Sequence, residues 1–110
     1  MNFAIIPDED ALSKCTWCGS RIDEFSEVFA VDARLRPEID LHAYQGHCIQ
    51  LDLIRHAKTL NAMVSTDGSD AKAAGKDLMF MVCSKKCGTK LKKALKEEVS
   101  LGKLLSGASL

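Results

Sequence analysis

Two short stretches of this sequence carry paired cysteines, CTWCGS at residues 15–20 and VCSKKCGTK at residues 82–90. A tetrahedral Zn²⁺ site takes four thiolate or imidazole ligands, and two local pairs are the usual way to supply them. We therefore expect one zinc ion to be held by four residues from the two stretches: Cys15, Cys18, Cys83 and Cys87. Four protein sulfurs leave no open position for water or substrate, so the sequence predicts a structural metal and no enzyme activity.

The residues around each pair suit this role. Gly19 directly follows the first pair and permits the tight bend that brings its two sulfurs together. In the second pair, Cys83 falls where a strand should end and a helix begin, with Ser84 as the expected cap. A helix start favours negative charge, so we expect it to lower the thiol pKa values there and to support thiolate ligation.

A fifth cysteine, Cys48, follows His47 in a predicted strand. We favour a buried side chain for it, because most free cysteines behave as small hydrophobes. The alternative is that His47 or Cys48 replaces one of the four ligands. The three histidines, His42, His47 and His56, have no ligand-like spacing, and each is expected on the surface or in a loop.

Apolar periodicity predicts the elements that position these residues. Strands are expected over 27–35, 47–54, 60–64 and 77–83. A helix is expected over 84–105 that ends or frays near Gly102, with an apolar stripe of Leu91, Ala94, Leu95 and Val99. In the second and third strands, a competing helical stripe runs through Ile49, Leu53, Ala57, Leu60 and Val64; we prefer strands. The remaining segments are expected to form connections: a loop over 37–46, a turn over 55–58 and a loop with one short helix over 65–75.

These elements predict an α+β fold, a small antiparallel sheet with a C-terminal helix. The chain has 110 residues, which suggests one domain spanning residues 1–110. We expect its ends, residues 1–14 and 103–110, to be loosely ordered. A chain this short has a modest core, so a metal cross-link would add stability.

The cysteine stretches resemble the treble-clef class of zinc domains. In that class a knuckle, a β-hairpin and a helix follow one another, and the first turn of the helix gives the last two ligands. VCSKKC is similar to the FCS-x-x-C ending of the TRASH and MYM-type zinc fingers. The resemblance covers residues 15–19 and 78–95, with an unusually long insert between the pairs. It implies a treble-clef-like site and a role in protein interaction or metal sensing.

Composition limits the other classes of function. The formal net charge is zero, but residues 1–60 hold 6 basic and 10 acidic residues, and residues 61–110 hold 9 and 5. The N-terminus lacks the basic start of a signal peptide, and no apolar run approaches the ~20 residues of a membrane span. We therefore expect a cytoplasmic protein without membrane contact, in which spaced cysteines indicate metal or redox chemistry.

Several functional alternatives remain open from the sequence. We expect a binding module with a protein partner. A second hypothesis is a nucleic-acid accessory protein that makes weak, nonspecific contacts through Lys86, Lys90 and Lys93, with Arg21 on the same surface. A third is a metal- or redox-sensing thiol protein in which Cys15 and Cys18 act as a redox pair. That pair lacks the βαβ setting of a thioredoxin-like motif.

Overall fold

The strands form where the sequence alternates between apolar and other side chains. The structure is a computed structural model that describes residues 4–7, 12–22, 29–36, 39–53, 55, 57–98 and 105–109. Its strands are β1 Ile5–Ile6, β2 Phe29–Leu35, β3 Cys48–Leu53, β4 Lys58–Val64, β5 Leu78–Val82 and β6 Leu105–Ser109. Its helices are the 3₁₀ turn η1 His42–Tyr44, the short α2 Asp70–Ala73 and α3 Lys85–Glu97.

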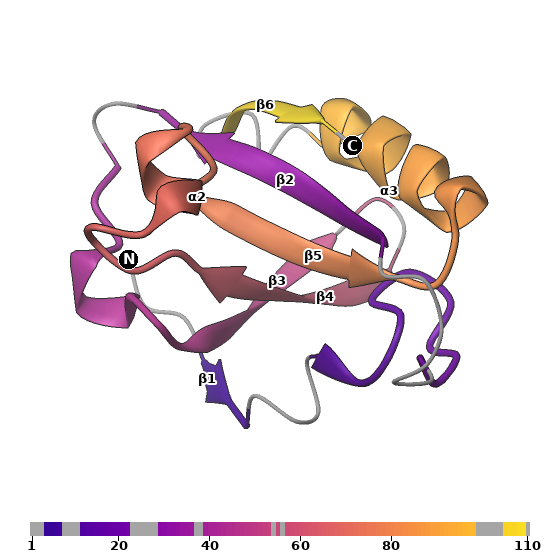
Figure 1. The fold of residues 1–110 in the computed structure, drawn as a ribbon. Coiled ribbons are helices and arrows are strands. Elements are labelled where there is room, and N and C mark those ends of the chain that lie inside the picture. Colours follow the sequence, from indigo (N-terminus) through magenta and orange to yellow (C-terminus); the bar gives the residue numbers. More distant parts are fainter. Residues whose placement is uncertain are drawn as a thin grey trace.

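The strands make one sheet in the order β1-β3-β4-β5-β2-β6, and every pairing is antiparallel. Strands β2 and β5 are far apart in the chain, yet they pair along five residues, from Phe29 opposite Val82 to Ala33 opposite Leu78. Figure 1 shows α3 lying against one side of the sheet, with its start beside the end of β5. The fold class is therefore α+β, as the sequence predicts.

One face of the sheet carries the core. The alternating residues of four strands point into it, and α3 adds the three apolar residues of its predicted stripe that the structure describes. These buried residues are Val31, Ala33, Leu35, Ile49, Leu51, Leu53, Leu60, Ala62, Val64, Leu78, Phe80, Val82, Leu91, Ala94 and Leu95. The four strands predicted over 27–35, 47–54, 60–64 and 77–83 are present as β2 to β5, and each buries one face. Val99, the last residue of the predicted stripe, lies outside the described residues.

Strands β3 and β4 form an antiparallel pair where the competing stripe would have made a helix. Strands β3 and β4 pair over six residues, from Cys48 opposite Met63 to Leu53 opposite Lys58. The period of two therefore prevails over the competing helical stripe, because both strands bury one face in the core. Next to this pair of strands, the buried carboxylate of Glu98 accepts a hydrogen bond from the backbone N–H of Arg55 at 3.0 Å.

The structure differs from the sequence prediction at both ends of the chain. Residues 5–6 pair with β3, and residues 105–109 pair with β2 as an edge strand, although both segments were expected to be loosely ordered. Short segments with little periodicity give no strand signal; an available sheet edge supplies the backbone partners instead. Helix α3 ends at Glu97 and not near Gly102. Residues 8–12, whose sequence DEDAL predicts a short helical turn, lie largely outside the described residues.

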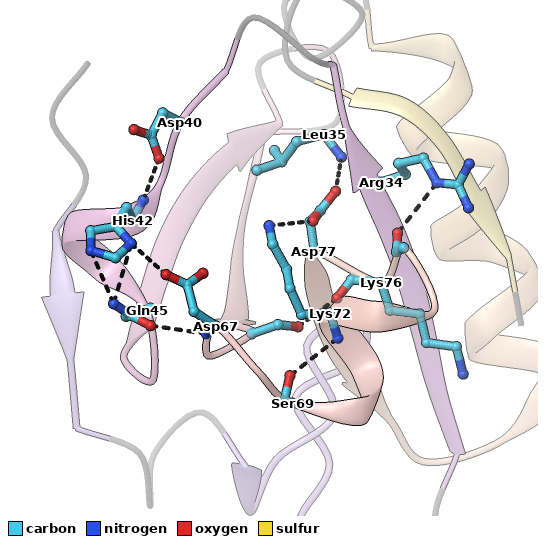
Figure 2. Close-up of polar contacts among 12 residues, drawn as sticks. Arg34, Leu35, Asp40, His42, Gln45, Asp67, Ser69, Lys72, Lys76 and Asp77 are labelled. Atoms are coloured by element: carbon cyan, nitrogen blue, oxygen red, sulfur yellow. Dashed lines mark hydrogen bonds and ion pairs between the residues drawn. The ribbon is translucent and has the colours of Figure 1, made fainter.

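A polar network closes the end of the sheet at α2, away from the cysteines. The two carboxylate oxygens of Asp77 accept hydrogen bonds from the Lys72 ammonium at 2.7 Å and from the Leu35 backbone N–H at 2.8 Å (Figure 2). Ser69 caps α2, the short helix predicted within 65–75, and accepts a hydrogen bond from the Lys72 backbone N–H. Lys76 pairs with Asp32 at 3.4 Å. Both α2-side lysines therefore have carboxylate partners.

No helix among the described residues has the length and apolar character needed to cross a bilayer. Helix α3 is the longest, with 13 residues, and its outer surface is rich in lysine. Its buried residues face the sheet, so the helix belongs to the core on one side and to the surface on the other.

Candidate metal centre

The four cysteines from the two ends of the sequence lie together in the fold. The Sγ atoms of Cys15, Cys18, Cys83 and Cys87 are all within 4.8 Å of one another. The Cys83 sulfur lies 3.6 Å from the Cys18 sulfur and 3.6 Å from the Cys87 sulfur. No disulfide links these residues, and all four are free thiols. The folded chain thus converts two local pairs into one cluster of sulfurs that is compatible with a metal ion.

The first pair lies in a tight turn that we call the knuckle, residues 14–21. A backbone bridge between Lys14 and Arg21 closes its base, and the N–H of Gly19 bonds to the carbonyl of Cys15 at 2.9 Å. Gly19 has a φ of +79°, the left-handed conformation that glycine adopts without strain. The Cys18 N–H points at the Cys15 sulfur at 3.5 Å. The predicted sharp bend after Cys18 is confirmed.

The second pair lies at the junction of β5 and α3. Cys83 follows the last residue of β5, and Ser84 is the N-cap of α3, as the sequence predicts. The Ser84 hydroxyl accepts a hydrogen bond from the Cys87 backbone N–H at 3.2 Å. This cap fixes the first turn of the helix and so holds Cys87 on the same side as Cys83, where their sulfurs meet.

The knuckle is held between two strands of the sheet that separate from each other. Strands β4 and β5 pair only at Met63–Met79 and Val64–Leu78; the same register would place Asn61 opposite Met81. Thr16 occupies this opening. Its backbone N–H donates to the Met81 carbonyl at 2.9 Å, and its hydroxyl accepts from the Asn61 N–H at 2.7 Å. The sheet therefore positions the knuckle through Thr16, next to the end of β5 (Figure 1).

Lys58 gives the knuckle a second anchor. Its ammonium donates to the Trp17 carbonyl at 2.7 Å and lies 4.3 Å from the centre of the Trp17 ring. Trp17 itself packs against the core cluster. Because Lys58 begins β4, the strand that also carries Asn61, both anchors tie the knuckle to the same strand.

The cluster is partly open to solvent. Cys15 is buried at 2% exposure, Cys83 and Cys87 are half-buried, and Cys18 is exposed. The Ser20 hydroxyl and backbone hydrogen bond to the Cys18 sulfur and lower the pKa of this thiol to about 6. The metal-free cluster thus has a preferred site for one negative charge at Cys18.

The expectation that the helix start lowers the thiol pKa values of the second pair is wrong for the metal-free protein. The hydrogen bond to Cys18 raises the pKa of Cys83, because Cys83 acts as the donor to a thiolate. Burial, followed by the hydrogen bond with Cys83, raises the pKa of Cys87 to about 12. Both shifts follow from burial and from hydrogen bonds among neighbouring sulfurs.

The remaining sequence candidates lie elsewhere. Cys48 is completely buried in β3, which confirms the preferred prediction, and neither it nor His47 belongs to the cysteine cluster that the described residues form. His47 and His42 are exposed, as expected. His42 forms an ion pair with Asp67 at 2.6 Å in the loop region shown at the left of Figure 2. His56 lies outside the described residues.

Comparisons with protein-family models, with curated proteins and with solved structures all find nothing similar. The four-cysteine cluster, and not a shared ancestry, therefore provides the basis for assigning a function.

Sequence reasoning missed the residues that place the knuckle. Thr16, Ser20 and Lys58 have no motif of their own, and only the folded structure brings Asn61 and Met81 to Thr16. For Ser20 a weak signal existed, since a hydroxyl two residues after Cys18 is well placed to hydrogen bond to that sulfur.

Proposed function

We propose that Cys15, Cys18, Cys83 and Cys87 bind one Zn²⁺ that stabilises the fold. Zinc–sulfur bonds of about 2.3 Å arranged as a tetrahedron require sulfurs about 3.8 Å apart. Two of the sulfur separations in the structure are 3.6 Å, close to this value, and no sulfur pair exceeds 4.8 Å. The zinc would join the knuckle to the β5–α3 junction, two segments 64 residues apart. This convergence of four thiols is the observation that carries the proposal.

The order of the elements supports a treble-clef-like arrangement. The knuckle comes first, the antiparallel pair β2 and β5 stands where that class has its hairpin, and α3 supplies the last ligand in its first turn. Residues 36–77, which contain β3, β4 and α2, are then an insert within the hairpin. This insert accounts for the long gap between the cysteine pairs, which the resemblance to TRASH and MYM-type zinc fingers would otherwise leave unexplained.

The role that this site supports best is binding, with a protein as the partner. A metal with four sulfur ligands keeps no position for substrate. The sheet face away from the core carries half-buried methionines, Met63 and Met79 side by side and Met81 one step along β5. Methionine adapts its shape and is frequent at binding surfaces. A zinc-stabilised module that presents this face to another protein is our conclusion.

Metal analysis tests the zinc site. Purified protein should contain one zinc per chain, and Cys→Ser changes at each of the four cluster positions should abolish tight binding. Cys48→Ser is the matched control and should keep full zinc. Chelation should loosen or unfold the chain, because metal affinity is coupled to folding free energy. Zinc retained by the Cys15→Ser and Cys87→Ser variants would rule the site out.

Cobalt substitution separates a structural site from a catalytic one. The Co²⁺ form should show the visible spectrum of a tetrahedral thiolate site, and added imidazole or cyanide should leave it unchanged, since no coordination position is open. A spectral change on adding these ligands would indicate an open position and contradict the structural role.

The partner surface has its own test. If a protein partner binds the zinc-loaded chain, Met79→Lys should abolish that binding. Gln50→Lys should preserve it, although it adds the same charge to an exposed position on the same sheet face. Equal effects of the two variants would place the contact elsewhere.

A further inference from the structure

Helix α3 carries a concentration of positive charge, with six lysines against one acidic residue, Glu97, at its end. Six lysines fall between residues 85 and 96, and the segment from Leu78 to Lys96 contains no acidic residue. None of these six lysines forms an ion pair with the residues that the structure describes, whereas Lys72 and Lys76 both pair with carboxylates. Five of these lysines are exposed and Lys92 is half-buried, so the surface of α3 before Glu97 is predominantly positive.

Three of them form a straight row, Lys86, Lys90 and Lys93, which we call the basic row. Steps of four and three residues keep them on one side of the helix, over a length of about 10 Å. All three are exposed, and they lie opposite the side that buries Leu91 and Leu95 in the core. Core packing thus fixes the direction in which the basic row points.

The arrangement is unfavourable for the isolated helix. Like charges three or four residues apart repel each other, and lysines in the first turn oppose the helix dipole. The negative charge of a zinc–thiolate centre would offset Lys85 and Lys86, which flank Cys87. This negative charge would be largely screened at Lys93. Lys93 lies six residues, or about 9 Å along the helix axis, beyond Cys87, and this distance is close to the Debye length of about 8–10 Å at physiological salt.

We propose that the basic row binds the phosphate backbone of double-stranded nucleic acid without sequence preference. Lysine is depleted from protein–protein interfaces, which favour aromatic and arginine anchors, and the exposed side of α3 has neither. An anionic membrane fits less well, because the apolar residues of α3 are committed to the core. The exposed side of the helix also lacks the Arg, Asn and Gln side chains that read base edges.

Salt dependence of duplex binding tests this proposal. Three phosphate contacts predict a log–log salt slope of about −2.7, so a random-sequence 20-base-pair duplex should bind about 40-fold more weakly at 200 mM than at 50 mM salt. The double variant Lys90→Gln/Lys93→Gln leaves one contact, and the same change in salt should then weaken binding only about 3- to 4-fold. Fluorescence anisotropy of a labelled duplex measures both ratios.

The matched control is Lys72→Gln/Lys76→Gln, which removes the same charge from the α2 side and should keep the full salt slope. Both double variants retain the four cysteines, and their zinc content and circular dichroism report whether they fold. The proposal is overturned by absence of duplex binding at 50 mM salt, by equal losses in the two variants, or by tighter binding of a labelled glutamate-rich peptide than of the duplex. None of these outcomes would alter the metal content that tests the zinc site.

Discussion

Replacing Thr16 with valine removes the hydroxyl group that helps to anchor the knuckle to the sheet. Valine has nearly the same shape as threonine but lacks the hydroxyl that accepts the Asn61 N–H at 2.7 Å. That N–H lies in the opening between β4 and β5, in a partly buried position. A buried donor left without its acceptor costs about 1–3 kcal/mol.

The loss should therefore appear as a lower free energy of unfolding in urea for the zinc-loaded protein. For a domain of this size, about 1 kcal/mol corresponds to a fall of roughly 4–8 °C in the melting temperature. Thr16→Ser keeps the hydroxyl and should restore most of the stability. Thr89→Val, a matched change on the exposed side of α3, should stay within about 0.5 kcal/mol of the parent chain.

Zinc affinity adds a second measurement. Because Thr16 lies between Cys15 and Cys18, a loosened knuckle should also give up zinc more readily to a chelator in competition. If Thr16→Val and Thr89→Val prove equally stable, and chelator competition does not distinguish them, the seating of the knuckle between β4 and β5 is refuted.

Three further predictions follow from the site and the core. Zinc binding at pH 7 should release at least about two protons, because the raised pKa values keep Cys83 and Cys87 protonated without metal. Calorimetry in buffers of different ionisation enthalpy should measure this release, and zinc binding should weaken at lower pH. Release of less than one proton would contradict the prediction. Leu91→Ala should lower the unfolding free energy by about 2–5 kcal/mol, since the side chain is fully buried; a loss below 1 kcal/mol in urea denaturation would argue against the α3 packing. Gly75→Ala should lower the unfolding free energy by at least about 1 kcal/mol in the same assay, because φ of Gly75 is +81° and the new Cβ would lie 2.5 Å from the Arg34 guanidinium. An unchanged urea midpoint would contradict this left-handed conformation of Gly75.

Period and spacing were sufficient for most of the secondary structure. Strands β2 to β5 each bury one face, and a buried face leaves a period of two in the sequence that survives even where a helical stripe competes, as at Ile49 and Leu53. The cap at Ser84 and the bend at Gly19 are local features with local causes, so they were predictable. The edge strands were not, because the backbone pairing of residues 5–6 and 105–109 depends on a sheet edge that only the whole fold provides.

The sequence by itself determined which side chains are suited to bind a metal, because cysteine pairs beside a glycine turn and at a helix start constrain their own sulfurs locally. Only the tertiary structure decided that the two pairs meet. Pairing of β2 with β5 brings the β5–α3 junction back across the sheet, and Thr16 fits the opening that β4 and β5 leave. A contact between segments 64 residues apart depends on the register of the strands between them, and no short stretch of sequence encodes that register alone.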